Sequence, residues 1–312
     1  MNLNKGSSMQ PLLTKIVSSV SQVLLGKEEQ VKLAVACMIA QGHLLIEDLP
    51  GMGKTTLAHC LANVLGLQYE RVQFTSDLLP ADILGMSIFD KNTSQFQFHS
   101  GPIFTQLLLA DEINRTTPKT QSALLEAMEE GQVTIEGETR PLPKPFFVIA
   151  TQNPLSQSGT FMLPESQLDR FLMKLSLGYP NHASERLLLS GIKPRELITS
   201  MEASLSLTEL SELQTQVVAV NCSDSLLDYL QALIEFTRTD VQFSYGLSPR
   251  GSQAWLQAAK AWALLAGRDY VIPEDVQAVA ESVVAHRVKG VESGAGHQYL
   301  VKYLLNSVDV IA

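Results

Sequence analysis

Short apolar runs alternate with helical patterns over the first 180 residues. Four runs have the length and composition of buried strands: "HLLIE" from residue 43, "ERVQF" from 70, "QLLLAD" from 106 and "FFVIAT" from 146. Between them apolar residues recur at helical spacing, as in "KTTLAHCLANVL", which is closed by Gly66. Strands that alternate with helices predict an α/β fold with a parallel sheet covered by helices on both faces.

The pattern changes past "GYPN" at residue 178, where the strand signals stop. The segment "RGSQAWLQAAKAWALLAG" ends at Gly267, and "PEDVQAVAESVVAHR" begins with Pro273 and acids in its first turn, as helices do. We therefore expect an α/β domain over residues 1–180 and a smaller all-helical domain over 181–312.

Two segments interrupt the alternation of strands and helices. Residues 85–101 form two short strand patterns around a polar turn, and residues 131–147 do the same around Glu136-Gly137. We expect two hairpins inserted beside the sheet. The alternative, which the sequence supports equally well, is that these two segments are surface additions without a function.

The segment "IEDLPGMGKTT", residues 46–56, ends like a phosphate-binding loop. In the pattern G-x-x-x-x-G-K-[ST], Gly53, Lys54 and Thr55 fill the last three fixed positions, while Asp48 stands where the first glycine belongs. A strand precedes the loop and a helix follows it, which is the arrangement that points backbone N–H groups at phosphates. The alternative is a plain strand-turn-helix joint with an exposed lysine.

Each loop residue has an expected part in nucleotide binding. Gly51 and Gly53 let the backbone approach closely, Lys54 reaches the β- and γ-phosphates, and the Thr55 hydroxyl is offered to Mg²⁺. Pro50 stiffens the turn in place of the missing glycine. The candidate nucleotide-binding residues of this segment are Pro50, Gly51, Met52, Gly53, Lys54, Thr55 and Thr56.

An acid pair ends the third apolar run, in "LLLADE". There Asp111 can hold Mg²⁺ through water, and Glu112 can act as the base that activates an attacking water. Acids at the end of a strand are common alone, but together with a phosphate-binding loop they are specific. Because a base beside water favours hydrolysis over phosphoryl transfer, we expect a hydrolase rather than a small-molecule kinase.

Two further polar residues depend on their surroundings for a role. Asn153, at the tip of "FFVIAT", can bind the attacking water or the γ-phosphate if its strand lies between those that carry the loop and Asp111. An asparagine before Pro154 is also a frequent turn arrangement. Arg170, in "LPESQLDRFLMKL", is less informative, because Asp169 and Glu165 can neutralise it.

Arg250 stands where a cation is disfavoured. In "LSPRGSQAW" Ser248 is a good N-cap and Pro249 a good first helical residue, so Arg250 falls in the first turn, near the positive end of the helix dipole. A phosphate between Arg250 and the α/β domain would relieve this conflict. The alternative is a surface arginine paired with a nearby acid.

Composition narrows the class of protein. The 312 residues are 45% apolar and 18% charged with a net charge of −9, which argues against binding nucleic acid through a basic surface. Three widely spaced cysteines (Cys37, Cys60 and Cys222) argue against a disulfide framework or zinc site, and the six histidines show no metal-binding spacing. The N-terminus lacks an apolar signal core, and the run "LAVACMIA" is too short to span a bilayer, so we expect a cytoplasmic protein without membrane insertion.

These motifs together resemble the MoxR family of AAA+ ATPases. The resemblance rests on "EDLPGMGKTTLA", "RVQFTSDLLPADILG", "LPESQLDRFLMK", "GLSPRGS" and the long block from "GPIFTQLLLADEINR" to "FFVIATQNP". It covers nearly the whole chain after about residue 20. The family commonly carries E-D/G-V-P-G-x-G-K-T here, so Asp48 matches a family trait. One departure is "LSQSGTF", where relatives tend to carry an acid near Ser158.

The resemblance implies an αβα ATPase domain with a helical lid, assembled as a hexameric ring with ATP and Mg²⁺ at the subunit interfaces. On that pattern Lys54, Thr55, Asp111 and Glu112 match the Walker residues, with Thr55 and Asp111 holding Mg²⁺ in part through water. Asn153 matches sensor 1, Arg170 the finger that reaches a neighbour's γ-phosphate, and Arg250 the sensor 2 of the lid. The first hairpin would be the helix-2 insert with Phe96 and Phe98 near the pore, and "VLLGKEE" would place Val23 and Gly26 against the base.

The expected function is ATP hydrolysis that drives remodelling or maturation of a protein client. The resemblance implies a chaperone-like role, often with a von Willebrand factor A domain protein as partner. One alternative is a nucleic-acid motor or transcription activator, against which the acidity and the lack of an added DNA-binding domain argue. Another is the motor subunit of a metal chelatase, whose sequence block is similar.

Overall fold

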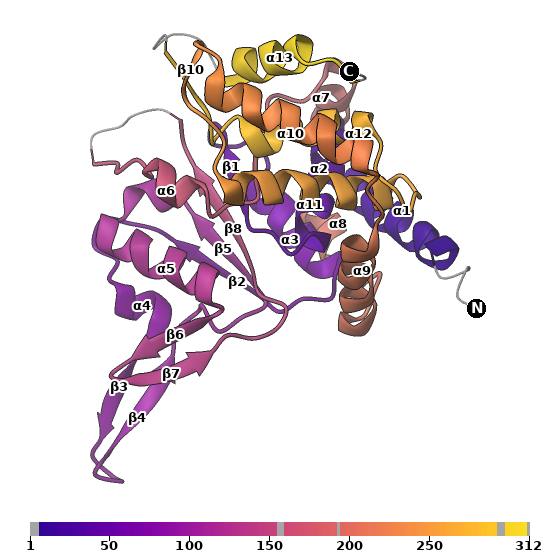
Figure 1. Cartoon of the computed structure of the whole chain (residues 1–312). Coiled ribbons are helices and arrows are strands. Elements are labelled where there is room, and N and C mark those ends of the chain that lie inside the picture. Colours follow the sequence, from indigo (N-terminus) through magenta and orange to yellow (C-terminus); the bar gives the residue numbers. More distant parts are fainter. Residues whose placement is uncertain (1–5, 155–158, 192–193, 292–296, 311–312) are drawn as a thin grey trace, which may run out of the picture.

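A five-stranded parallel sheet forms the centre of the molecule (Figure 1). The computed structural model describes residues 6–154, 159–191, 194–291 and 297–310. In spatial order the strands are β2 (Tyr69–Gln73), β5 (Leu107–Asp111), β8 (Phe147–Gln152), β1 (Leu44–Glu47) and β9 (Met173–Leu175). Four of these strands are predicted by the apolar runs, and every neighbouring pair in the sheet is parallel. The fifth, β9, was not predicted.

Helices cover both faces of the sheet, because alternate strand residues point to opposite sides. Leu44 and Ile46 of β1 belong to one hydrophobic cluster and Leu45 to the other. The first cluster is completed by α1 (Gly6–Val23), α2 (Glu28–Ile39) and α3 (Lys54–Val64), and the second by α5 (Pro118–Glu130). The predicted α/β class with three layers is thereby confirmed. Shorter elements join them: α4 (Pro80–Leu84), the 3₁₀ turn η1 (Ile113–Arg115) and α6 (Glu165–Leu168).

Strand β2 differs from the prediction of a buried strand. It lies at the edge of the sheet, and Glu70, Arg71 and Gln73 are exposed. By contrast every residue of β5 and β8 is buried. The polar letters in "ERVQF" reflect this edge position, since only one side of the strand is paired.

Two antiparallel hairpins project from one end of the α/β body (Figure 1). The first pairs β3 (Gly85–Asp90) with β4 (Gln95–Ser100), and the second pairs β6 (Gln132–Ile135) with β7 (Glu138–Pro141) around a turn at residues 136–137. Arg140 of the second hairpin lies over the ring of Phe98 in the first, 4.0 Å from its centroid. The side chains of the two hairpins are thus in contact.

Past β9 the described chain is mainly helical. The helices are α7 (His182–Leu189), α8 (Pro194–Thr199), α9 (Leu207–Ala219), α10 (Asp224–Thr239), α11 (Pro249–Leu265), α12 (Pro273–Val284) and α13 (His297–Ser307). The two helices predicted from sequence correspond to α11 and α12. Two short strands that were not predicted, β10 (Phe243–Tyr245) and β11 (Lys289–Gly290), form an antiparallel pair.

The N-terminal helices connect the sheet to the helical region. Both α1 and α2 contact α11, and one hydrophobic cluster runs from the sheet through α2 into α11 and α12. The predicted boundary near residue 180 falls between β9 and α7 and stays a prediction. No helix in the described part of the chain is long and apolar enough to cross a membrane.

Candidate functional site

The phosphate-binding loop joins β1 to α3 at the carboxyl edge of the sheet. Gly51 and Gly53 have φ angles of 86° and 93°, which favour glycine, and a Cβ at either position would meet no atom within 4 Å. Gly53 is the N-cap of α3, so the open side of the loop adjoins the free N–H groups of the helix. This geometry is that of an anion-binding site.

Lys54 folds back onto its own loop. Its Nζ donates hydrogen bonds to the carbonyl oxygens of Asp48, at 2.5 Å, and Leu49, at 3.0 Å. Burial lowers the pKa of Lys54, and the carboxylates of Asp48, Asp111 and Glu112 act in the opposite direction. The lysine is therefore set between the loop and both acids of the predicted pair.

The other predicted loop residues surround this lysine. Pro50 is exposed, Met52 packs partly against the core, and Thr55 and Thr56 are half-buried in the first turn of α3.

Asp48 explains why the loop needs no first glycine. It does not have a positive φ, and its carboxylate is buried. Oδ1 accepts a hydrogen bond from Leu49 N at 2.9 Å, while Oδ2 accepts from Gly178 N at 2.6 Å and Ser176 Oγ at 3.2 Å. The side chain therefore ties the loop to the segment that follows β9.

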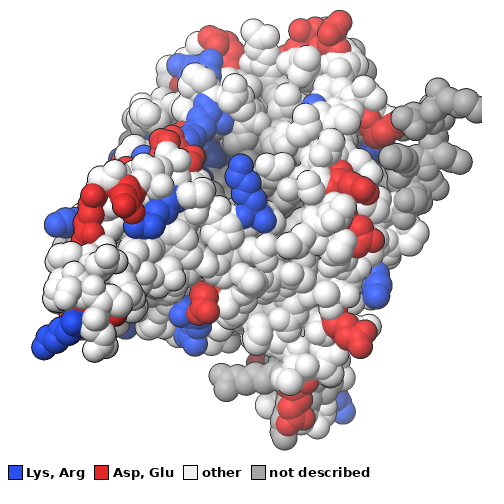
Figure 2. All heavy atoms as spheres, turned by 90° about the horizontal axis from the view of Figure 1, so that it is seen from below, with Lys and Arg blue, Asp and Glu red and all other residues white. Residues whose placement is uncertain are grey.

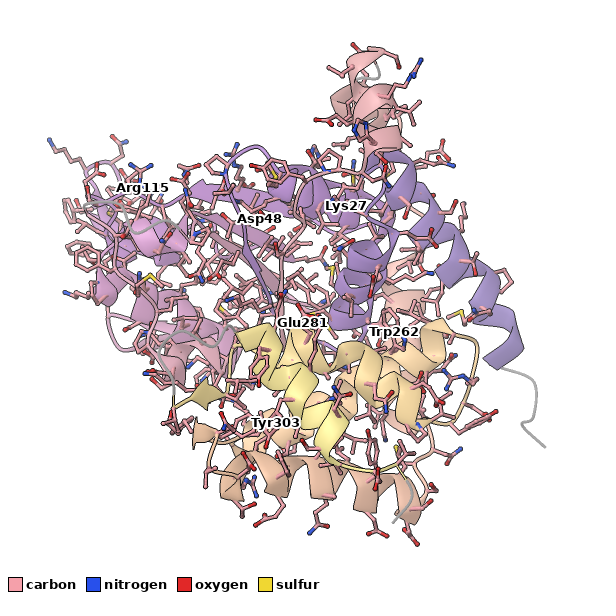
Figure 3. The ribbon with its side chains drawn as sticks, turned by 90° about the horizontal axis from the view of Figure 1, so that it is seen from above. Lys27, Asp48, Arg115, Trp262, Glu281 and Tyr303 are labelled. Carbon is pink, nitrogen blue, oxygen red and sulfur yellow. The ribbon has the colours of Figure 1, made fainter. Side chains whose placement is uncertain are left out.

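That segment also reaches the predicted base-binding residues. Lys27 lies near Asp48 (Figure 3), and its Nζ donates to the carbonyl oxygen of Tyr179 at 2.5 Å. A Cβ on Gly26 would lie 2.4 Å from Ser184 Oγ, so only glycine fits there without displacement. Val23 ends α1 with its side chain in the core. Residues 178–184, in which "GYPN" indicates only a domain boundary at the level of sequence, thus form a wall beside Gly26.

The acid pair at the end of β5 is held by the neighbouring strand β8. Thr151 Oγ1 donates to Asp111 Oδ1 at 2.6 Å and accepts from Glu112 N at 2.9 Å. Glu112 adopts a left-handed conformation, with φ 58°, that is uncommon for a residue with a side chain, and Arg115 Nη1 donates to its Oε2 at 2.8 Å. Strain of this kind clusters at functional sites. No sequence signal identified Thr151.

Asp111 has a second partner that the sequence did not reveal. Arg71 of the edge strand β2 donates to Asp111 Oδ2 through Nη2, at 2.7 Å, and Nε, at 3.2 Å. The register of β2 and β5 pairs Gln73 with Asp111 and so places Arg71 two residues earlier on the adjacent strand. This contact can be predicted only when it is known that β2 and β5 are neighbouring strands.

Asn153 follows β8, and β8 lies between β1 and β5. The condition that the sequence analysis set for a role of Asn153 is therefore met. Its carbonyl oxygen accepts a hydrogen bond from Asn114 Nδ2 at 3.3 Å. The loop, the acid pair and Asn153 thus share one edge of the sheet, because carboxyl ends of parallel strands lie together. Ser158, near the departure from the family pattern, lies outside the described residues.

The two predicted arginines lie at the amino ends of the parallel strands, at the end of the sheet opposite the phosphate-binding loop. Arg170 and Arg250 border a cleft of about 430 Å³ that is also lined by Gln41, Gly42 and His43, which precede β1. The four residues of β1, at about 3.3 Å each, separate this edge from the phosphate-binding loop by roughly 13 Å. The structure does not bring either arginine to the loop of its own chain.

Both arginines contact Glu129. Arg250 does occupy the first turn of α11 behind the Ser248 cap, but a carboxylate rather than a phosphate relieves its unfavourable place: Nη2 lies 2.6 Å from Glu129 Oε1. Arg170 Nη2 lies 3.0 Å from Glu129 Oε2. The acids expected to neutralise Arg170 have other partners, since Asp169 bonds Arg287 and Ser248, and Glu165 faces Lys289.

A buried arginine fixes the segment that carries Arg170. Arg287, which follows α12, donates through Nε to Asp169 Oδ1 at 2.7 Å and through Nη2 to Phe171 O at 2.5 Å. Its pKa is lowered mainly by burial, and Asp169 opposes that shift. Asp169 also accepts from Ser248 Oγ at 3.0 Å. The helical region and both arginine-bearing segments are thereby joined at one point.

Comparison with known proteins agrees with this geometry. The profile of the ATPase family associated with various cellular activities (AAA) matches residues 43–173, and that of the AAA lid domain matches residues 235–298. The chain is 47% identical over 280 residues to the uncharacterized protein YeaC of Bacillus subtilis, covering 90% of this chain and 88% of the relative. It is 39% identical over 287 residues to chaperone MoxR1 of Mycobacterium tuberculosis, covering 88% and 75%.

A solved structure shows the same fold over the whole chain. The crystal structure of a candidate ATPase from Cytophaga hutchinsonii superposes with a TM-score of 0.88 at 34% identity, covering 99% of this chain and 97% of that one. With these relatives and the arrangement of the loop, the acid pair and the lid, the chain belongs to the MoxR family of AAA+ ATPases.

Proposed function

We propose that this protein is a Mg²⁺-dependent ATPase that works as a hexameric ring, in the manner of its family, and remodels or matures protein clients. One observation carries the proposal: each chain has a phosphate-binding loop with its acids at one sheet edge and two arginines at the other. A complete site then needs the arginines of one subunit beside the loop of the next.

Nucleotide binding would use the loop much as it stands. Backbone N–H groups at Gly51 to Thr55 receive the phosphates, and the positive φ angles of both glycines shape the turn. Lys54 Nζ would release the carbonyl oxygens of Asp48 and Leu49 and donate to phosphate oxygens, so that the ammonium group pairs with an anion. Val23, Gly26 and the wall at residues 178–184 would bound the base.

The donor set beside the loop fits Mg²⁺. Thr55 supplies a hydroxyl and Asp111 a carboxylate, and Mg²⁺ prefers oxygen ligands, few of them from protein when phosphates are present. Within the described residues no cluster of three His, Cys, Asp or Glu forms a metal cage, which suits an ion held mainly by nucleotide. Bound Mg²⁺ would offset charge on the phosphates.

Hydrolysis would depend on Glu112 as the base for the attacking water, with Asn153 orienting that water. Thr151 is a positioning residue, because its hydroxyl bonds both the Asp111 carboxylate and the backbone N–H of Glu112. Arg170 and Arg250 would stabilise the charge that develops on the phosphate of the neighbouring subunit.

The client is proposed to be a protein. The relative named chaperone MoxR1 supports this choice, and so does the exposed Phe96 at the tip of the projecting β3–β4 hairpin. In Figure 2, basic side chains are interspersed with acidic ones and do not gather in a broad patch on that face, as nucleic-acid binding would favour. A von Willebrand factor A domain protein is the proposed partner, and the cytoplasm the proposed location.

Glu112→Gln tests the proposed function. This variant should bind Mg²⁺-ATP normally yet hydrolyse it at least ~100-fold more slowly, the usual scale for a lost general base. Lys54→Ala, as the matched loop variant, should weaken nucleotide binding itself. Near-normal turnover by Glu112→Gln would remove Glu112 from the mechanism. Affinity capture with the same variant, held in its ATP state, would identify the client, and stimulation of ATPase activity by DNA alone would favour a nucleic-acid motor.

A further inference from the structure

One carboxylate is shared by the two arginines at the amino edge of the sheet. Arg170 Nη2 contacts Oε2 of Glu129 at 3.0 Å, and Arg250 Nη2 contacts Oε1 at 2.6 Å. Because each guanidinium takes a different oxygen, the carboxylate draws both cations to one point. Two arginines converging on one anion is also the arrangement that binds a phosphate group.

The position of Glu129 in its own helix does not favour an acid. It lies in the last turn of α5, where the helix dipole disfavours an acid. Gly131, with φ 61°, ends the helix two residues later. An acid that breaks a local preference often serves a site elsewhere. Here the site is the arginine pair.

The remaining charges of the cleft are already matched. Asp169 and Arg287 bond each other at 2.7 Å, so Glu129 is the acid lining the cleft that faces Arg170 and Arg250. The side chains of Arg170, Glu129 and Arg250 are 27%, 33% and 47% exposed. An incoming anion can therefore reach all three.

We propose that Glu129 is a specificity-determining residue that makes this arginine pair respond to ATP and not to ADP. The inference rests on the proposed function, in which the pair meets the nucleotide of a neighbouring subunit. The carboxylate competes with that nucleotide for the same guanidinium groups. ATP displaces it, because its additional phosphoryl group carries more negative charge and extends further from the loop, whereas ADP does not.

The test compares Glu129→Gln with Glu130→Gln, which removes the same charge from the next residue of α5. Glu130 has no ion pair in the described structure. Self-assembly of the full chain is followed by sedimentation over a range of protein concentrations, with Mg²⁺-ADP or with Mg²⁺ and a non-hydrolysable ATP analogue. The wild type and Glu130→Gln should assemble at lower concentration with the analogue than with ADP.

The quantity compared is the protein concentration needed for assembly with Mg²⁺-ADP divided by that needed with the ATP analogue. Glu129→Gln should reduce this ratio by about 3- to 10-fold, the scale of losing a partly exposed ion pair together with the repulsion between Glu129 and the phosphates. The change should come mainly from stronger assembly with ADP, and Glu129→Ala should shift the ratio in the same direction. An unchanged ratio, or weaker assembly with both nucleotides, would overturn the inference. Thermal unfolding of each variant verifies that it is folded.

A second measurement is independent of assembly. In a Lys54→Ala background, where the loop binds phosphate poorly, pyrophosphate should raise the melting temperature of the Glu129→Gln chain more than that of Glu130→Gln. Equal shifts would contradict the inference. If Arg170→Ala and Arg250→Ala both assemble and hydrolyse ATP like wild type, the proposed trans arrangement itself fails. If they lose these properties while Glu129→Gln keeps the wild-type ratio, only the role of Glu129 fails.

Discussion

At the scale of single residues, Asp48 shows how a side chain can replace the usual first glycine of a phosphate-binding loop. The backbone there does not need a positive φ, and the carboxylate accepts hydrogen bonds from Leu49 N, Ser176 Oγ and Gly178 N. Since Gly178 begins the wall beside Gly26, Asp48 connects the phosphate end of the site to the proposed base-binding end.

Replacing Asp48 with the consensus glycine should therefore harm the protein. Asp48→Gly leaves the half-buried N–H of Gly178 without its acceptor and removes the acceptor of the Ser176 hydroxyl, which water can reach. We expect a loss of roughly 1–3 kcal/mol in the free energy of unfolding, the scale of one unsatisfied group. Asp48→Asn, which keeps one acceptor oxygen, should lose less. Urea unfolding measures both. An Asp48→Gly chain as stable as wild type would show that the tether contributes nothing.

His43 gives the stability a pH dependence. Its Nδ1 accepts a hydrogen bond from Val148 N at 3.0 Å, so its proton is assigned to Nε2, which faces Met128 O at 3.2 Å. Burial lowers the pKa of His43 from 6.5 to about 4. Because the unfolded chain binds the proton first, stability contributed by neutral His43 is complete above about pH 6.5 and is lost as pH falls towards 4.

The size of this effect is bounded by about 1.4 kcal/mol per pKa unit, or at most about 3.5 kcal/mol for the shift from 6.5 to about 4. His43→Gln, which cannot titrate, should show a flatter decline between pH 6.5 and 4 when the free energy of unfolding is measured by denaturant titration. Carboxylates titrate in the same range, so the difference between the two curves is the informative quantity. Parallel curves would contradict the assignment.

At the scale of elements, the β3–β4 hairpin holds two phenylalanines, Phe96 and Phe98, in different surroundings, although the sequence pattern does not distinguish them. Phe96 is 73% exposed and touches Phe89 across the hairpin. Phe98 is half-buried between Phe104 and the guanidinium of Arg140. Alternation places both on one side of β4, but contact with the second hairpin covers only Phe98.

We therefore expect different consequences from the two substitutions. Phe98→Ser should lower the melting temperature and cost about 1–3 kcal/mol, since it removes packing beneath Arg140. Phe96→Ser should keep the stability and the basal ATPase rate but lose stimulation by a client. Melting curves and ATPase rates of both variants provide the measurement. If Phe96→Ser retains full stimulation, Phe96 does not contact the client.

Local patterns predicted the elements whose signal lies within one segment. The loop at Lys54 and the acids after β5 were found because each motif sits in its own strand-turn unit. Strand β9 was missed, because three residues carry no periodicity and the strand exists through its pairing with β1. For the same reason the contacts of Thr151, Arg71 and Glu129 were not predicted, since each depends on which elements become neighbours.

At the scale of the whole molecule, the parallel sheet places the two halves of the proposed site at opposite ends of its strands. The loop, Asp111 and Glu112 lie at the carboxyl ends of the strands, and Arg170, Arg250 and the acid that they share lie at the amino ends. Arg287 joins the helical lid to the segment of Arg170 through Asp169. In the proposed ring, a movement of the lid would therefore shift the arginines of one subunit relative to the nucleotide of the next.

Mixing two inactive variants tests this account most directly. Arg170→Ala should lose about 10³- to 10⁵-fold in ATPase rate, as arginine fingers elsewhere do, while it still binds ATP. Lys54→Ala should be inactive because it binds ATP poorly. Under conditions where assembly and subunit exchange are verified, phosphate release is measured across mixing ratios. Rings containing both chains have interfaces where an intact loop meets an intact Arg170, so activity should recover in part and peak at intermediate ratios. A flat baseline at every ratio, or full activity of Arg170→Ala alone, would contradict the trans arrangement.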